Sequence, residues 1–303
     1  MATSDTPSST RSSELPEQIR HAFSGDAPLW FPVLASSLVG DFQRQVHERG
    51  WGRESYGTYR WIASDPRTAR TAAGAVSIGS AGFVVEVLPA AAKRVLTGLP
   101  IEERPASDVV ERLQAAIDLI AHVDGLAESI GRVVGSCHVL SAERGYDVSY
   151  STPALPMSIF VSVPGADERH AVPRLAESLI HEAMHLQLTF IESAVPLVKR
   201  TDATAFSPWK EGDRPVQGLL HGLYVFAVIH QALAELARAV PESREYVERR
   251  CAEITDEVAA IGDARPGLTA DGIALWELLA ARLEASDGSL AARPIWPAAD
   301  TVE

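Results

Sequence analysis

Residues 157–193 read MSIFVSVPGADERHAVPRLAESLIHEAMHLQLTFIES, and this stretch decides the predicted fold. Apolar and small residues alternate over 157–163, which predicts a β-strand, and the PGAD sequence that follows is typical of a turn. From Pro173 to Ser193 the apolar residues recur at helical spacing, so a long amphipathic helix is expected next. Because most of the remaining chain has helical patterning, we expect a mainly α protein with a small β-sheet, an α+β fold.

The rest of the sequence is organised as one domain with short ends. Ser, Thr and Pro dominate residues 1–13, which are predicted to be disordered, and the Ala- and Pro-rich residues 289–303 are predicted to form a loose tail. Residues 14–288 then form a single globular domain. Residues 67–99 are ambiguous between strand and helix, and 201–214 are predicted to be a loop. Further helices are predicted at 14–50, 105–131, 215–240, 242–261 and 269–285, and further strands at 132–140 and 146–152.

The composition is that of a soluble, acidic protein. Hydrophobic residues make up 46% of the chain and charged residues 22%, which is ordinary for a globular domain. Lys and Arg number 27 against 40 Asp and Glu, and a chain this acidic, without a basic run, repels nucleic-acid phosphates and anionic lipid. No apolar signal segment begins the chain. We therefore expect a cytoplasmic protein with no nucleic-acid or membrane partner, in which Cys137 and Cys251 are separate buried thiols.

The HEAMH sequence of the predicted helix places two histidines on one face. His181 and His185 are four residues apart, which separates them by about 6 Å along the helix axis. Two imidazoles at this spacing can bind one cation, and Glu182 can reach a water or substrate bound to that cation as a catalytic acid or base. The alternative is a pair of surface histidines beside an unrelated carboxylate. The sequence favours the metal site.

A third metal ligand must come from elsewhere in the chain. Glu192 shares the helical face, but it lies eleven residues beyond His181, about 16 Å along the helix, and it cannot bind the same ion. His221, on the next long helix between Gly218 and Gly222, fits better; the alternative is a core histidine bonded to a carbonyl. Glu211, in the preceding loop, is a further candidate for the third ligand.

The same loop carries a candidate anion site. Lys210 and Arg214 precede the N-terminus of the helix that carries His221, and cations near a helix N-terminus favour a carboxylate ligand. Arg214 can bind both oxygens of a carboxylate, with Lys210, Ser207 or Tyr224 assisting. The alternative is that these cations pair with the neighbouring acidic residues Glu211 and Asp213 on the surface.

Three segments carry a resemblance to a known family. They are RLAESLIHEAMHLQL (174–188), FSPWKEGDRPVQGLLHGLYVF (206–226) and YSTPALPMSIFVSVP (150–164). Together they resemble the HExxH-type, 2-oxoglutarate-dependent peptide β-hydroxylases, which are related to the HExxH extensions of SPASM-type radical SAM proteins. The resemblance covers residues 105–240. It implies a zincin-like strand followed by the HExxH helix, with a second metal-site helix packed against it.

The resemblance also implies an activity. A non-haem Fe(II) dioxygenase of this family would use O₂ and 2-oxoglutarate to hydroxylate a side-chain β-carbon of a ribosomally made precursor peptide. Iron would be held by His181, His185 and His221, with Glu182 as a ligand or a partner of the ligands. Arg214, then Lys210, would bind the cosubstrate carboxylate, and the strand at 157–163 would align the peptide.

Two other functions fit the same residues. In a zinc metallopeptidase, Glu182 would act as the general base that deprotonates a zinc-bound water, and the cations of the loop would be incidental. In a peptide-binding module without activity, the fold would be kept without its metal. The oligomeric state and the identity of the peptide are open at this point.

Overall fold

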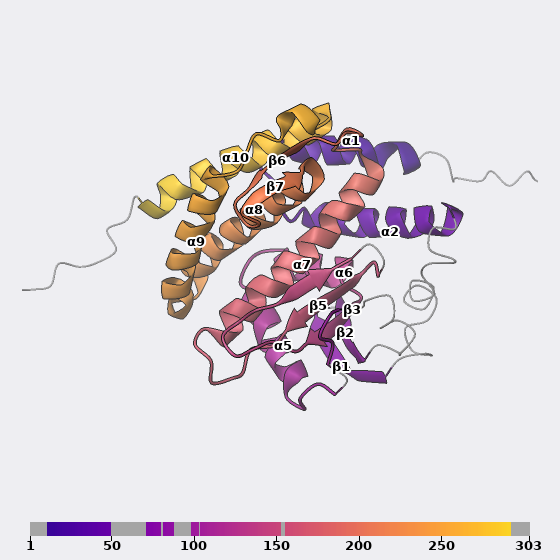
Figure 1. Ribbon diagram of the computed structural model, residues 1–303. Coiled ribbons are helices and arrows are strands. Elements are labelled where there is room, and N and C mark those ends of the chain that lie inside the picture. The colour runs from indigo at the N-terminus through magenta and orange to yellow at the C-terminus, as the bar shows by residue number, and fades with distance from the viewer. Residues whose placement is uncertain are drawn as a thin grey trace, which may run out of the picture.

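The protein is described by a computed structural model that covers residues 11–49, 71–79, 81–87, 98–102, 104–152 and 155–291 (Figure 1). The predictions for residues 1–10, 50–70 and 292–303 lie outside these ranges. The helices are α1 (Arg11–Phe23), α2 (Pro32–Arg49), α5 (Val109–Ile120), α6 (Leu126–Val133), α7 (Ala171–Ala194), α8 (Val216–Ala239), α9 (Arg244–Ala259) and α10 (Ala270–Ala291). The strands are β1 (Thr71–Ile78), β2 (Ala81–Val87), β3 (Ser136–Leu140), β4 (Ser149–Ser151), β5 (Ser158–Ser162), β6 (Thr204–Ser207) and β7 (Gly212–Pro215). The predicted α+β class, mostly helical with a small sheet, is confirmed.

The main sheet has five strands in the order β1-β2-β3-β5-β4. β2, β3 and β5 are parallel to one another, while β1 and β4 run antiparallel to their neighbours at the two edges. Every residue of β3 and β5 is buried, as expected of strands covered on both faces. The strand at 157–163, which was expected to align the peptide, has no free edge, because β5 pairs with β3 on one side and β4 on the other. The edge on this side of the sheet is β4.

α7 joins the sheet to the helical layer. It packs on β4 and β5 and also against α5, α2 and α8, and α8 in turn packs against α9 and α10 (Figure 1). α8 is long and apolar enough to span a membrane, but 78% of its most apolar window is buried inside the protein, as in the core helix of a soluble domain. Cys137 and Cys251 are free and buried, as predicted.

Three predicted elements differ from the structure. The helix expected at 14–50 is two helices, α1 and α2, separated by residues 24–31. The single helix expected at 105–131 is two helices, because the chain turns at Gly125 with a φ of +69°, a left-handed conformation that glycine adopts without strain. The loop expected at 201–214 contains a two-stranded hairpin, β6 and β7, which pairs Phe206 with Asp213. Its connection includes Glu211 at a φ of +50°. This hairpin carries Ser207, Lys210 and Arg214, and it packs on α8.

Candidate metal centre

His181 and His185 lie on one face of α7, as the sequence predicts. Their Nε2 atoms are 3.2 Å apart. Two nitrogens bonded to one ion at about 2.1 Å each are separated by roughly 3.0–3.4 Å, depending on the angle at the metal. The two imidazoles therefore stand at the spacing of a shared ligand pair before any ion is added.

His221 reaches this pair from α8, but it contacts the other nitrogen of His185. The two rings stack with their centroids 5.4 Å apart, and their Nδ1 atoms are 3.1 Å apart. The three imidazoles thus form a row and do not surround one point. In the described ranges, no group of three or more His, Cys, Asp or Glu side chains is arranged to hold a metal ion. The structure brings the three predicted histidines together, with ligand spacing at the first two.

Glu192 ends this row. As predicted, it does not reach His181; instead its Oε2 atom lies 3.1 Å from Nε2 of His221. The side-chain amide of Gln217 donates to the same oxygen at 2.9 Å. Both Glu192 and His221 are mostly buried, with 14% of each side chain exposed. Sequence reasoning missed this contact because the two residues come from different helices.

Glu182 is buried beside the pair. Only 3% of the residue is exposed, and its Oε1 atom is 3.9 Å from Nε2 of His181. The hydroxyl groups of Ser149 and Ser151, on the edge strand β4, donate to this carboxylate. Burial raises the pKa of Glu182 to about 7, and the two hydrogen bonds oppose that rise. Near neutral pH this carboxyl group can therefore both accept and release a proton.

Both histidines of the pair are neutral at physiological pH. Burial, followed by the positive charges of Arg250 and Arg214, lowers the pKa of His181 to about 4. Burial also lowers the pKa of His185 well below its ordinary value, and the neighbouring imidazoles and Arg214 add to this shift. A neutral imidazole keeps the lone pair that a metal requires, so both groups are ready to act as ligands.

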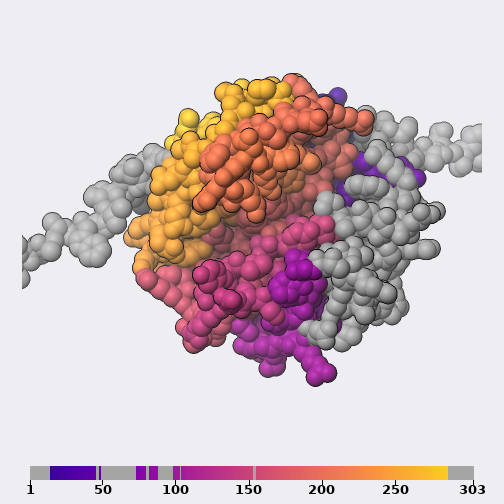
Figure 2. All heavy atoms as spheres, in the orientation of Figure 1, coloured from indigo at the N-terminus to yellow at the C-terminus, as the bar shows by residue number. Residues whose placement is uncertain are grey.

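The histidines open into a cavity of about 620 Å³, the site cavity. Its walls come from β4, α7, α8 and the β6–β7 hairpin, and include Tyr150, Trp209 and Phe226. A second cavity of about 770 Å³ shares Ser149, His181 and Phe226 with it. The two cavities therefore adjoin each other at His181. In Figure 2 the orange segment with the hairpin and the rose segment near residue 150 appear on the same face of the molecule.

The predicted cations, Lys210 and Arg214, both line the site cavity. Neither side chain forms a hydrogen bond or an ion pair with any residue that the structure describes, so the alternative pairing with Glu211 and Asp213 is not formed. Arg214 is close enough to lower the pKa of both His181 and His185. The guanidinium is thus an unpaired positive charge at the edge of the histidine row.

The other predicted anion-binding residues lie outside this cavity. Tyr224 is fully buried in the core, where its hydroxyl donates to the carbonyl of Leu29 at 2.8 Å and its ring stacks on Phe31. Ser207 is also fully buried, and its hydroxyl has no partner among the described residues. Neither Ser207, Tyr224 nor Glu211 lines the cavity. The structure therefore does not bring Ser207 or Tyr224 to the site cavity, and the Tyr224 side chain points into the core instead.

Two glycines of α8 let the hairpin lie close to the helix. A Cβ added at Gly218 would stand 2.4 Å from Nε of Arg214, and one at Gly222 would stand 2.3 Å from the ring of Trp209. Trp209 also stacks on Phe226, with centroids 4.8 Å apart, and its Nε1 atom donates to Glu257 at 3.0 Å. Trp209 and Phe226 were missed from the sequence, although the spacing of the two glycines, one helical turn, indicates a close approach on this face.

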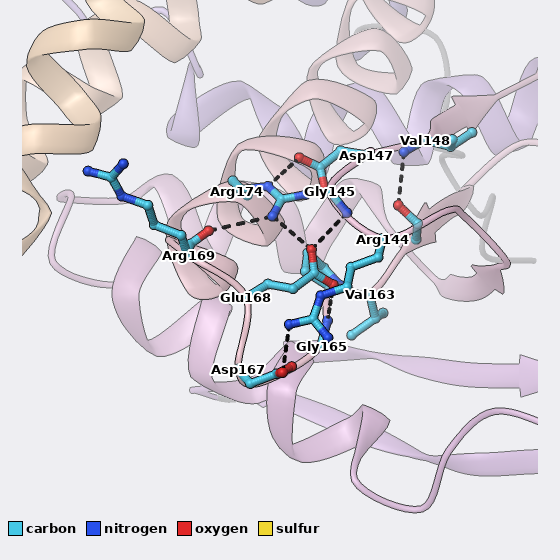
Figure 3. Close-up of polar contacts among 12 residues, drawn as sticks. Arg144, Gly145, Asp147, Val148, Val163, Gly165, Asp167, Glu168, Arg169 and Arg174 are labelled. Carbon is cyan, nitrogen blue, oxygen red and sulfur yellow. Dashed lines mark hydrogen bonds and ion pairs between the residues drawn. The ribbon is translucent and has the colours of Figure 1, made fainter.

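A polar network fixes the strand β4 relative to α7 (Figure 3). Arg174, in the first turn of α7, donates to both carboxylate oxygens of Asp147 at 2.8 Å and to Glu168 at 3.1 Å. Glu168 also accepts hydrogen bonds from the backbone N–H groups of Gly145 and Gly165. These contacts hold the chain immediately before β4 against the helix, and so keep its serine hydroxyls within reach of Glu182.

No protein-family model matches this chain, and a search of curated proteins finds no significant match. What the protein does must therefore be inferred from its own side chains and their geometry.

Proposed function

We propose that this protein is a non-haem Fe(II)- and 2-oxoglutarate-dependent oxygenase that hydroxylates a side-chain β-carbon of a ribosomally made precursor peptide. The observation that carries the proposal is the guanidinium of Arg214, which lines the cavity of the histidine pair without a partner among the described residues. A partly buried, unpaired cation beside a metal site favours an anionic ligand there. A hydrolase that binds only water and peptide at its metal does not require such a group.

The donor set fits a divalent iron. Nε2 of His181 and Nε2 of His185 would hold it, because they have the spacing of a ligand pair and both rings are neutral. With 2-oxoglutarate and O₂, bound Fe(II) would supply the oxidation, in which one oxygen atom enters the peptide and the other enters succinate, with release of CO₂. Glu182, a buried carboxyl group with a pKa near 7, would position a water or the peptide and hold a proton beside the metal.

Arg214 would bind the cosubstrate. A guanidinium presents two parallel N–H groups to a carboxylate, whereas Lys210, which is more exposed, offers a single charge. Because Arg214 comes from the hairpin and the histidine pair from α7, a ligand with a carboxylate at each end can span the site cavity between them. A dicarboxylate such as 2-oxoglutarate has this shape.

The edge strand β4 would align the peptide. The carbonyl of Val148 accepts a hydrogen bond from Ser162 of β5, and backbone groups alternate in direction along an antiparallel strand. The backbone groups of Ser149 and Ser151 consequently point away from β5, toward an edge that no described strand occupies. An extended peptide bound there by strand addition would run along the two adjoining cavities and pass His181.

The activity can be tested directly. Purified protein with Fe(II), 2-oxoglutarate, O₂ and the peptide encoded by the neighbouring gene should add one oxygen atom to the peptide and release an equal amount of succinate. Arg214→Gln should raise the KM for 2-oxoglutarate more than Lys210→Gln does, because only the guanidinium binds two oxygens at once. Failure to oxidise any candidate peptide, together with no release of succinate, would contradict the proposal.

A second candidate function is a zinc metallopeptidase. It is favoured by Glu182, whose raised pKa suits a general base, and whose oxygen lies 3.9 Å from Nε2 of His181. Supplied with Zn²⁺ and no cosubstrate, a peptidase would cleave the peptide, and Arg214→Gln would leave cleavage unchanged. Binding of the peptide with neither oxidation nor cleavage would instead indicate a binding module without activity.

A further inference from the structure

Four side chains form a continuous row of short polar contacts across two helices. Nε2 of His181 is 3.2 Å from Nε2 of His185, and Nδ1 of His185 is 3.1 Å from Nδ1 of His221. Nε2 of His221 is in turn 3.1 Å from a carboxylate oxygen of Glu192. Each ring of the inner two histidines therefore uses both of its nitrogen atoms, one toward each neighbour in the row.

The proton positions in this row can be assigned by starting from the carboxylate of Glu192. A carboxylate can only accept, so Nε2 of His221 carries the proton that it donates to Glu192. With one proton on the ring, Nδ1 of His221 is an acceptor, and Nδ1 of His185 must donate to it. This leaves Nε2 of His185 without a proton and with its lone pair directed to the side of His181. One tautomer each of His185 and His221 satisfies the contacts from His185 to Glu192 and leaves Nε2 of His185 available to a metal.

We infer that His221 is a positioning residue that orients His185, and that it is not the third metal ligand. This inference rests on the metal site proposed above. A metal-binding histidine ordinarily donates its second ring N–H to an acceptor, which fixes the tautomer and the orientation of the ring. His221 occupies that place on His185, and Glu192 occupies the same place on His221.

The surroundings keep this row in place. Gln217 donates to the same oxygen of Glu192 that His221 contacts, so the carboxylate is held from two positions on α8. If His221 turned to bind the ion of the pair, Nδ1 of His185 would lose its partner and the Glu192 carboxylate would keep Gln217 alone. The row as it stands leaves no such group unpaired.

The test is an oxygen-free titration of the full-length protein with Co²⁺, followed by absorption spectroscopy of the bound ion. Wild-type protein should bind one Co²⁺ per chain, and both His181→Ala and His185→Ala should abolish this binding. His221→Ala should still bind one ion, with an affinity about 10- to 100-fold weaker, as expected when a partner of a ligand is removed. X-ray absorption of the wild-type complex should count two imidazole ligands.

Two further variants separate positioning from a general loss of structure. The amide oxygen of His221→Asn can still accept from Nδ1 of His185, so this variant should recover much of the affinity that His221→Ala loses. Glu192→Ala should weaken binding in the wild-type protein but have little further effect in His221→Ala, because both act through one row.

Loss of Co²⁺ by His221→Ala as complete as by His185→Ala, or three imidazoles around the ion, would overturn the inference while leaving the proposed oxygenase intact. If wild-type protein binds no Co²⁺, the proposed metal centre itself is wrong.

Discussion

The side chain of Arg214 lies across Gly218, one turn of α8 before His221, so closely that a Cβ at position 218 would stand 2.4 Å from Nε of the arginine. The missing side chain at Gly218 thus defines where the guanidinium sits relative to the histidine row. A glycine inside a helix normally costs about 1 kcal/mol relative to alanine. At this position the glycine leaves room for the Arg214 side chain beside the candidate metal site, which links the local sequence to the proposed cosubstrate binding.

Gly218→Ala should separate stability from cosubstrate binding. The substitution should raise the free energy of unfolding by up to about 1 kcal/mol, because Arg214 is a flexible side chain that can move away from the new methyl group. The displaced guanidinium should weaken 2-oxoglutarate binding by about tenfold, a loss of about 1.4 kcal/mol. Urea unfolding and a calorimetric titration would measure the two effects. Gly212→Ala is the matched control, since a Cβ there meets only the Lys210 carbonyl at 3.8 Å.

Gly222→Ala, one turn further along α8, should have the opposite effect on stability. Its Cβ would stand 2.3 Å from the ring of Trp209. This ring is held in place because it stacks on Phe226 and donates a hydrogen bond to Glu257. Overpacking of this kind costs about 1–3 kcal/mol, which exceeds the gain in helix propensity of about 1 kcal/mol. Urea unfolding should show a less stable protein. A variant as stable as Gly218→Ala would mean that the hairpin is not packed on α8 in this way.

The network before β4 predicts a pH-dependent stability difference. Hydrogen bonds from the N–H of Gly165, then from Arg174 and the N–H of Gly145, lower the pKa of Glu168 below its ordinary value of 4.5. A carboxyl group with a lowered pKa stabilises the folded state above its ordinary pKa, and this contribution is lost as the pH falls through the folded-state pKa. Glu168→Gln should therefore be less stable than wild type at pH 7, and the difference should shrink below pH 4.5. Thermal unfolding across this range measures it.

The control for this prediction is Glu143→Gln, an exposed residue in the same connection whose side chain has no described partner. Its unfolding temperature should equal that of the wild type both at pH 7 and below pH 4.5. A stability difference between Glu168→Gln and wild type that stays constant down to strongly acidic pH would contradict the assigned role of the Glu168 carboxylate.

The sequence predicted best what depends on local periodicity. The helix with HEAMH, the buried strand before it and the apolar helix α8 all follow from the spacing of apolar residues, and their positions are confirmed. The four-residue spacing on one helix also predicted that His181 and His185 lie together, and the eleven-residue spacing predicted that Glu192 does not reach His181. These relationships need no knowledge of the tertiary structure.

The remaining features depend on contacts between distant segments. The approach of Glu192 to His221 joins α7 to α8, and the direction of Tyr224 depends on which face of α8 meets the core. The resemblance assigned the alignment of the peptide to the strand at 157–163, but this strongly apolar strand lies inside the sheet between β3 and β4. The less apolar β4, with its serines, is the strand that lies at the edge.

The measurement that tests the central claim most directly is a calorimetric titration of 2-oxoglutarate, without oxygen, into the Fe(II)-loaded protein. We predict one 2-oxoglutarate per chain, binding that disappears when the metal is removed, and an affinity about 10- to 100-fold weaker in Arg214→Gln, which loses a charge-assisted pair worth about 1.5–3 kcal/mol. No binding of 2-oxoglutarate, or binding of equal strength with and without the metal and the Arg214 guanidinium, would contradict the account.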